Sequence, residues 1–485
     1  MSHELLMLIA ILCPTLGSVL LPVAGKVSPR LRNTLSLLMV LTALGCSVAL
    51  LPSVLSGDLP AAHWEVKNLP LGLALSLKAD SLAVFMAIVS SLISAVIVAY
   101  STSYISHYGH QNEYYAMVTM FLGAMMGLVY SSSLILLYLF WEITAITSWR
   151  LIGFFREPFQ VRRADKAFLV TVFGALCMLL GFIAVWTAAG SCDMDVIHAK
   201  LGIGGLPFYA VGLILMGILA KSSTLPFHTW LPDAGVAPSP VTAMLHAAVL
   251  VKIGVYVFAR LFLVMLPLSL QWQTIVLVLA AASALVSATA ALIETDLKRI
   301  IAYSTVSQIA FIFLGFASGS TYGAVGGLLY ILMHGLAKGG LFLGAGVVEQ
   351  RTHTKDIRQM GGLIKTMPIT AVSFAFCAFS VMGIPPFGGF FSKFMVLSGG
   401  INGGHTWLTL VFIAGAVLTI LYLTRLFVVV FLGDKTAQAN EGSPVMVACV
   451  AVLAGLSLLG GLWINGASRW AWSAASGFLV PGLSQ

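Results

Sequence analysis

The stretch "YLFWEITAITSWRLIGF", residues 138–154, is strongly apolar and yet contains a carboxylate, Glu142. Apolar stretches of about twenty residues recur along nearly the whole chain, and each is long enough to cross a hydrocarbon core roughly 30 Å thick. Of the 485 residues, 59% are hydrophobic and only 9% are charged, whereas roughly one quarter of a soluble domain is charged. The sequence therefore predicts an all-α polytopic membrane protein.

We expect about fourteen transmembrane helices in a single membrane domain over residues 1–485, because no connection is long or polar enough to form a soluble domain. The expected spans lie near residues 4–22, 31–52, 80–100, 113–130, 133–154, 167–189, 206–236, 241–265, 272–293, 299–318, 322–347, 366–400, 406–432 and 444–465. We assign the first three helices to 1–112, a first repeat to 113–265, a second repeat to 272–432, and the last helix with a tail to 444–485. Leucines alternate with smaller residues in 61–80, which predicts a β-hairpin on the outer surface.

The distribution of basic residues predicts the topology. The N-terminus has no basic region ahead of its apolar run, so we expect a retained first helix rather than a cleaved signal. Basic residues cluster after the first, fifth, ninth and eleventh spans, all of them odd-numbered. The positive-inside rule places those loops in the cytoplasm and both termini outside. We therefore expect a multi-pass protein of the cell's inner (cytoplasmic) membrane.

The six cysteines are scattered without any Cys-x-x-Cys pair. This spacing argues against an iron–sulfur cluster, a zinc site or a disulfide framework. Nothing in the sequence resembles a phosphate loop, a nucleotide-binding glycine turn or a nucleophile–histidine–acid arrangement. We therefore expect no cofactor, no bound metal, and no redox or hydrolytic site in this chain, which leaves enzyme activity as a property of partner subunits.

Two predicted spans contain helix-breaking prolines near their centres. The stretch "AKSSTLPFHTWLPDAGVAPSP" (220–240) contains Pro226, and "FSVMGIPPFGGFFSKFMVL" (379–397) contains Pro385 and Pro386. Proline removes a backbone donor and clashes with the preceding turn, and irregular backbone at membrane depth survives only where protein or water covers it. A pair of broken spans therefore indicates an ion path. The breaks lie about five helices apart, and an odd offset inverts topology, so spans four to eight and nine to thirteen are candidate inverted repeats.

Titratable side chains inside the predicted spans form a series. They are Glu142, Lys221, His246, Lys252, His334, Lys338 and Lys393. Inserting a charge costs roughly 2.5–3.5 kcal/mol even on the gentlest scale, so each such residue is a functional candidate by default. Because neighbouring buried groups change one another's proton affinity, the series predicts a chain of proton sites. We expect Glu142 and Lys221 to form a pair where their helices meet.

Each of these residues also has a structural interpretation. Glu142 can form an ion pair with Arg150, which lies about two turns away on the same span, and Arg150 can compete with Lys221 for the carboxylate. The lysines beside the breaks can snorkel to an interface. The histidines can be ordinary hydrogen-bonded core residues.

Five motifs in order resemble one family. They are "LYLFWEITAITSWRLIGF", "AKSSTLPFHTWLPDAGVAPSPVTAMLHAAVLVKIGVYVFARL", "DLKRIIAYSTVSQIAF", "HGLAKGGLFLGAG" and "MGIPPFGGFFSKFMVL". They resemble the proton-translocating, antiporter-like subunits of respiratory complex I, membrane-bound hydrogenases and Mrp-type multisubunit Na⁺/H⁺ antiporters. The resemblance runs from about residue 76 to 432, and "TVFGALCMLLGF" (171–182) looks most like the N-terminal part of the large Mrp subunit.

The resemblance implies fourteen helices, two inverted five-helix repeats each with a broken helix, and a hydrated polar axis through the membrane centre. In the first repeat, its motifs match Glu142 to a fifth-helix glutamate, Lys221 to the lysine of a broken seventh helix, and Lys252 to a linking position of the eighth helix. In the second repeat, they match His334 and Lys338 to an eleventh-helix relay and Lys393 to a broken twelfth helix near the outward exit. His246 matches a family histidine.

From this resemblance we expect a proton-translocating subunit of a multisubunit complex, as in NADH-quinone oxidoreductase or an Mrp-type Na⁺/H⁺ antiporter. The expected partners are other membrane subunits, lipid and H⁺, with Na⁺ as a candidate second ion, and no nucleic acid. A second hypothesis is a membrane coupling subunit of an energy-dependent inorganic-carbon uptake system. A third is a passive membrane scaffold that has kept the fold.

Overall fold

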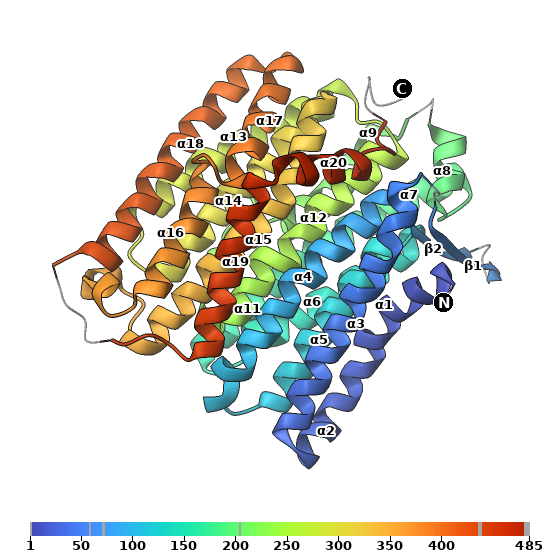
Figure 1. Cartoon of the computed structure of the whole chain (residues 1–485). Coiled ribbons are helices and arrows are strands. Elements are labelled where there is room, and N and C mark those ends of the chain that lie inside the picture. The colour runs from blue at the N-terminus through green and yellow to red at the C-terminus, as the bar shows by residue number, and fades with distance from the viewer. Residues whose placement is uncertain (1, 58–59, 70–72, 203–204, 435–438, 480–485) are drawn as a thin grey trace.

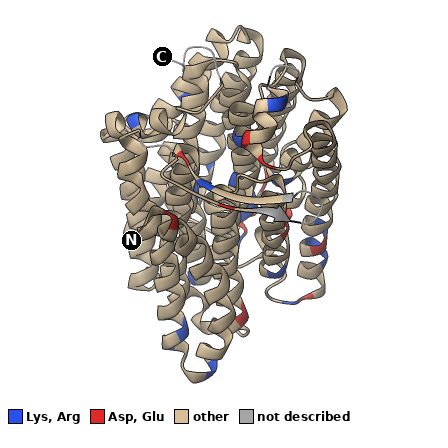
Figure 2. Cartoon of the chain, turned by 90° about the vertical axis from the view of Figure 1, so that its right-hand side faces the viewer, with Lys and Arg blue, Asp and Glu red and all other residues tan. Residues whose placement is uncertain are grey.

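The chain is described by a computed structural model covering residues 2–57, 60–69, 73–202, 205–434 and 439–479. Within these ranges, eleven helical stretches are long and apolar enough to cross a membrane. Figure 1 shows them packed side by side in one bundle, and charged positions are sparse along the ribbon (Figure 2). The structure is thus a helical membrane protein, while the count of fourteen spans stays a prediction.

The first half of the chain holds α1 (His3–Gly17), α2 (Leu21–Val27), α3 (Pro29–Leu55), α4 (Ser81–Tyr104), α5 (Gln111–Tyr130), α6 (Leu134–Ile152), α7 (Pro158–Ala189), α8 (Met194–Leu201), α9 (Phe208–Lys221) and α10 (Trp230–Asp233). The second holds α11 (Ser239–Ala243), α12 (Leu250–Ala259), α13 (Leu270–Ile293), α14 (Leu297–Ala317), α15 (Thr321–Thr352), α16 (Pro368–Met382), α17 (Gly388–Asn402), α18 (Thr406–Phe427), α19 (Pro444–Leu462) and α20 (Ile464–Ala474). Three π-helical segments, η5 (Met244–Ala248), η6 (Arg260–Met265) and η9 (Val428–Leu432), continue α11, α12 and α18. The sequence carried no signal for them.

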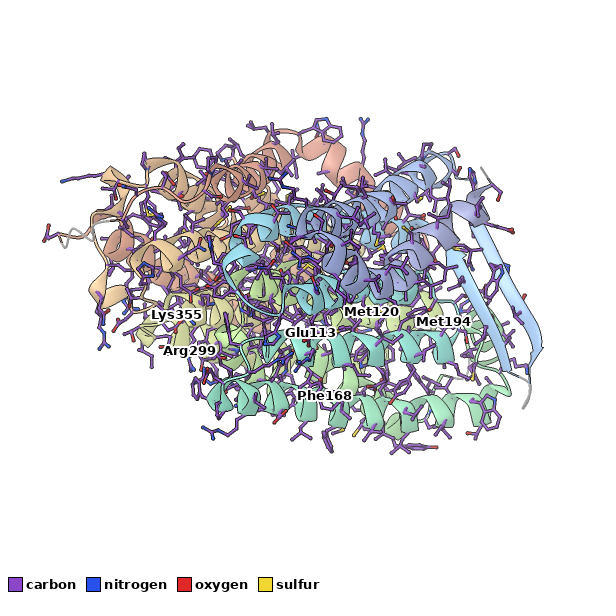
Figure 3. The ribbon with its side chains drawn as sticks, turned by 90° about the horizontal axis from the view of Figure 1, so that it is seen from below. Glu113, Met120, Phe168, Met194, Arg299 and Lys355 are labelled. Carbon is purple, nitrogen blue, oxygen red and sulfur yellow. The ribbon has the colours of Figure 1, made fainter. Side chains whose placement is uncertain are left out.

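One end of the bundle carries a hairpin of strands β1 (Ala62–Leu69) and β2 (Leu73–Ala79), which pair antiparallel. The expected hairpin segment includes 70–72, which lie outside the described residues. Both ends of the described part of the chain lie at this hairpin end: the ring of His3 is 3.1 Å from the carbonyl of Ala61, and Ser476 contacts Ser81 at 3.3 Å. At the opposite, basic end, Asp233 pairs with Lys166 and Arg299. In Figure 3 the labelled Arg299 lies away from the strands.

Burial separates central from peripheral helices. Between 83% and 100% of the apolar part is buried in α4, α14, α15 and the span 239–265, against 33% to 50% in the other long spans. The glycines of α15 permit this close packing, since a Cβ on Gly326 would lie 2.7 Å from the Met395 Cβ. α15 is therefore the central helix, and it carries two of the predicted site residues, His334 and Lys338.

Two helices are broken. α9 ends at Lys221, Pro226 lies in the irregular segment that follows, and helix resumes at Trp230. α16 ends at Met382, and Pro385 and Pro386 precede α17. The first runs from the hairpin end to the basic end and the second runs the other way, as inverted repeats would require, and the repeats themselves stay a prediction.

Residues 464–474 form α20, where we expected only a tail after the last span. Ala467, Ala471 and Ala474 are buried at helical spacing, while Trp472 is 39% exposed. An amphipathic helix this short lacks the continuous apolar run that identifies a span. In Figure 1 it lies across the ends of the neighbouring helices rather than along them.

Candidate functional site

The site begins where α6 meets the break after α9. Lys221 is the last residue of α9, where the helix dipole favours a cation, and it is fully buried. Its ammonium donates to the carbonyl of Trp141 at 3.3 Å and lies 5.2 Å from the centre of that indole ring. Glu142 is the next residue, and its Oε1 is buried without a hydrogen-bond partner among the described residues. The two predicted partners are therefore neighbours, with Lys221 bonded to the backbone.

Arg150 does not pair with Glu142. Its guanidinium forms an ion pair with Glu113 of α5, and Arg156 donates to the same carboxylate at 2.6 Å. Arg150 lies eight residues after Glu142 on α6, about two turns further towards the basic end. The structural interpretation of Glu142 as an ion-pair partner of Arg150 is therefore wrong, and Arg150 does not compete with Lys221.

A close helix contact connects Lys221 to the next lysine. Ser222 follows Lys221, and a Cβ on Gly254 of α12 would lie only 1.9 Å from its hydroxyl oxygen. That oxygen is buried without a hydrogen-bond partner in the described ranges. Gly254 thus brings the end of α9 against α12, two residues along the chain from Lys252.

Lys252 and His334 join the two halves of the bundle. Lys252 Nζ lies 2.7 Å from His334 Nδ1, and both residues are buried. Lys252 comes from α12 and His334 from α15, 82 positions later. Either a charged Lys252 donates to a lone pair of His334 Nδ1, or the Nδ1–H of His334 donates to a neutral Lys252 amine, so the contact accommodates one excess proton more readily than two.

His246 lies in the π-helical segment η5, so its side chain is turned out of α-helical register. Its ring centre is 4.3 Å from that of Phe342, and both ring nitrogens are buried without a partner in the described structure. His334 Nε2 is likewise buried without a hydrogen-bond partner among the described residues. Buried polar atoms of this kind are those that internal water satisfies.

A chain of neutral polar side chains connects Lys338 towards Lys393. Ser304 Oγ accepts from Lys338 Nζ at 2.6 Å and from the Tyr422 hydroxyl at 2.7 Å. The Gln308 amide donates towards the Tyr422 hydroxyl at 3.5 Å, and its oxygen accepts from Tyr330 at 2.5 Å. Sequence reasoning missed these residues. Ser304 and Gln308 are spaced four apart on a buried helix, and such a polar pair inside a span is a usable signal.

Lys393 occupies the second break. It is buried in the second turn of α17, and its ammonium donates at 2.6 Å to the carbonyl of Val381, in the last turn of α16. It also lies 5.8 Å from the ring centre of Tyr330, the end of the chain from Lys338. Both break lysines are therefore held by backbone carbonyls rather than by an acid.

Within the described ranges, no cluster of three or more His, Cys, Asp or Glu side chains is placed to hold a metal ion. The fold and the site together define a polytopic helical membrane protein with a buried line of ionisable side chains between two broken helices. The profile of one family, described as "NADH:quinone oxidoreductase/Mrp antiporter, TM", matches residues 131–419, more than half of the chain. The chain belongs to this family.

Relatives named for two kinds of assembly match the chain. A Na(+)/H(+) antiporter subunit of Bacillus subtilis is 36% identical over 368 residues, covering 70% of this chain and 46% of the relative. "NAD(P)H-quinone oxidoreductase subunit 5, chloroplastic" of Cryptomeria japonica is 33% identical over 446 residues, covering 86% of this chain and 59% of the relative. The chain spans about half the length of these curated relatives.

Two solved structures share the fold. A chain in the Mrp complex from Dietzia sp. superposes with a TM-score of 0.87 at 23% identity, covering 99% of this chain and 98% of that one. A chain in the membrane-bound sulfane sulfur reductase, an archaeal respiratory membrane complex, gives a TM-score of 0.89 at 21% identity over 98% and 97%. Both are chains of membrane complexes, and at these identities they establish the architecture.

Proposed function

We propose that this chain is a proton-translocating subunit of a multisubunit membrane complex. Protons move along a line of groups that begins at the half-buried Glu142 and continues through the buried Lys221, Lys252, His334, Lys338 and Lys393, with His246 beside its centre. The observation that carries the proposal is the 2.7 Å contact between Lys252 and His334, which links the half of the bundle with one broken helix to the half with the other.

That contact supplies a physical reason for proton movement. Two unit charges 2.7 Å apart repel by about 6 kcal/mol at an effective dielectric constant of about 20. The pair therefore holds one excess proton far more readily than two, so a proton arriving on Lys252 drives one off His334 towards Lys338.

Uptake at the basic end and release at the hairpin end fit the remaining geometry. A cavity of about 560 Å³ opens at the basic end, lined in part by Tyr104, Glu349 and Lys355. Glu349 is three turns along α15 from Lys338. The α17 helix runs from Lys393 to the hairpin end. In the proposed orientation, the basic end faces the cytoplasm of a cell with this chain in its inner membrane, and both termini lie outside.

The relatives suggest which complexes to consider. Mrp-type cation/H⁺ antiporters and NADH-quinone oxidoreductases are both candidates, with other membrane subunits as partners and Na⁺ as a candidate second ion. The inorganic-carbon coupling hypothesis is not favoured by the names of the relatives. The energy source belongs to the partners in either case.

Proton flux in the purified complex, reconstituted in vesicles with a pH-sensitive dye, tests the proposal. We expect Lys252→Met and Lys221→Ala each to lower driven flux at least tenfold, because each removes one protonatable step. The matched control is Lys200→Ala: this lysine of α8 also donates to a carbonyl, that of Ala189 at 2.7 Å, but lies outside the buried line. Wild-type flux in the Lys252 and Lys221 variants would favour the passive scaffold instead.

A further inference from the structure

A second polar column leaves the centre of the buried line. Lys252, Tyr256 and Arg260 are spaced four apart, so they lie on one face of α12 and η6, one turn after another towards the hairpin end. All three are buried, with 0%, 0% and 5% exposure. This column runs from Lys252 of the relay towards the hairpin end of the bundle.

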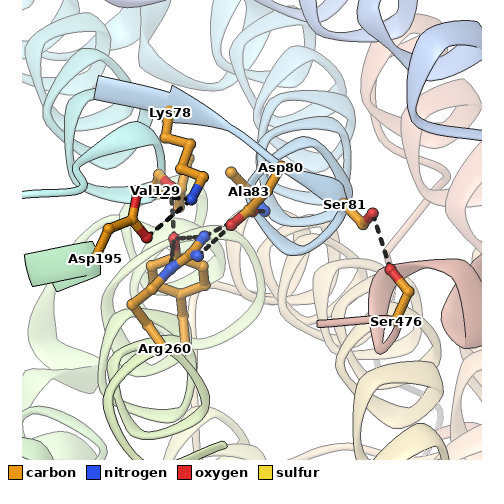
Figure 4. A network of polar contacts seen from close by, with 9 residues as sticks. Lys78, Asp80, Ser81, Ala83, Val129, Asp195, Arg260 and Ser476 are labelled. Atoms are coloured by element: carbon orange, nitrogen blue, oxygen red, sulfur yellow. Dashed lines mark hydrogen bonds and ion pairs between the residues drawn. The ribbon is translucent and has the colours of Figure 1, made fainter. Parts of the chain in front are cut away.

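The column ends in a network shown in Figure 4. The guanidinium of Arg260 contacts both carboxylate oxygens of Asp80, with Nη2 to Oδ1 at 2.8 Å. Its Nε and Nη2 also donate to the hydroxyl oxygen of Tyr256, at 3.0 and 2.8 Å. The Tyr256 hydroxyl in turn donates to the carbonyl of Val129 at 2.5 Å.

A cavity of about 190 Å³ begins where this network stops. Asp80 and Arg260 form its floor, and Lys78, Asp195 and His198 are among its polar walls. The C-terminal segment borders it through Leu479, whose N–H donates to the carbonyl of Leu263 at 2.5 Å. Polar groups therefore extend from Lys252 to the outer surface, and Arg260 stands between them and the cavity.

The two groups that separate Lys252 from the cavity, Tyr256 and Arg260, are in a state that cannot pass a proton. A phenol has two lone pairs and one O–H, and for Tyr256 these are taken by the two Arg260 N–H groups and by the Val129 carbonyl. Arginine has no acceptor and stays charged in proteins. A fixed cation in a narrow path repels an approaching proton, as the arginines of other selective pores do.

We propose that Arg260, held by Asp80 and Tyr256, is a barrier that prevents protons from escaping from Lys252 to the hairpin end. The inference rests on the proposed function, because it explains why protons on Lys252 continue to Lys393. Without the cation, protons on Lys252 would pass along this face of α12 into the outer cavity and would not reach Lys393.

The test is passive proton leak in vesicles containing the complete complex, with no driving substrate, an imposed pH gradient and a clamped potential. We expect the double variant Asp80→Asn/Arg260→Gln, which removes both charges and keeps hydrogen-bonding groups, to raise leak at least fivefold. Adding Lys252→Met should return leak to the wild-type level. Leak that does not rise, or that persists without Lys252, overturns the proposal.

Two controls separate charge from structure. Arg260→Lys keeps the cation and should stay as tight to protons as wild type, and a leak in that variant contradicts a charge barrier. Asp195→Asn breaks the neighbouring Lys78–Asp195 pair at the same cavity and should also leave leak unchanged. If the double variant does not assemble, Tyr256→Phe releases one anchor of the guanidinium and should at least double the leak, and no increase there refutes the barrier.

The outcome is distinguishable from failure of the proposed function. If driven flux is indifferent to Lys221→Ala, the relay itself is wrong. If driven flux needs Lys221 but neither the double variant nor Tyr256→Phe leaks through Lys252, the relay stands and the barrier fails.

Discussion

Replacing Asp80 with asparagine should destabilise the protein by about 3–5 kcal/mol, because it leaves the Arg260 guanidinium buried without its counter-charge. The Arg260 side chain is 7% exposed and that of Asp80 is 19% exposed. At the 2.8 Å separation of Nη2 and Oδ1, the attraction is about 6 kcal/mol for an effective dielectric constant of about 20. Part of it offsets desolvation of the pair, which is why the expected loss is smaller than the attraction.

The measurement is unfolding in mixed detergent micelles, followed by tryptophan fluorescence. Asp80 is also the N-cap of α4, accepting from Ala83 N–H at 2.9 Å, and asparagine keeps that cap. Asp80→Ala should therefore cost about 1 kcal/mol more than Asp80→Asn. The matched control is Asp195→Asn, whose pair with Lys78 is exposed and should be worth about 0–1 kcal/mol. A loss below about 1 kcal/mol for Asp80→Asn would refute the reasoning.

Three further outcomes are expected. Gly254→Ala should lower stability, measured by unfolding, and should lower driven proton flux several-fold, measured with the pH-sensitive dye. The reason is that the added Cβ would lie 1.9 Å from the Ser222 hydroxyl oxygen. Unchanged flux would mean that this helix contact does not affect the proton path. Gln308→Leu should slow driven flux, while uptake of the first proton in a single-turnover experiment should stay normal, because Lys338 precedes Gln308 on the proposed path. An equal loss of driven flux and of first-proton uptake would contradict that order. Stability should fall as pH drops below about 4. Burial alone would raise the pKa of Asp80 and of Glu294, but the Arg260 guanidinium holds the pKa of Asp80 below its ordinary value, and the Thr295 N–H with Arg299 does the same for Glu294. The stability that these carboxylates contribute is therefore present above about pH 4 and is lost as they become protonated in the folded protein. A flat acid profile from pH 5 to 2 would show that neither carboxylate matters.

Several features followed directly from the residues. The apolar spans identify a membrane protein because the thickness of the bilayer sets the length of an apolar run. The prolines near 226 and 385 mark the breaks because a missing N–H acts locally. The buried ionisable residues were found because inserting charge is costly wherever the helix packs. Each of these inferences depends on one segment at a time.

Other features depended on which helix faces meet. Arg150 lies on the same span as Glu142, but it pairs with Glu113 of α5. The chain from Lys338 was not predicted, because Ser304 and Tyr422 are separated by 118 positions. α20 was not predicted either, because its buried face is three alanines.

The sequence by itself determined the class of protein, the two broken helices and the ionisable residues that line its centre, since hydropathy, proline chemistry and the cost of buried charge are properties of single segments. Only the tertiary structure decided the partners. Lys252 meets His334 across 82 positions, and Arg260 meets Asp80 across 180. Such pairings arise from the packing of helices that are distant in the sequence, and side-chain contacts over that separation are set by packing rather than by any local preference of the chain.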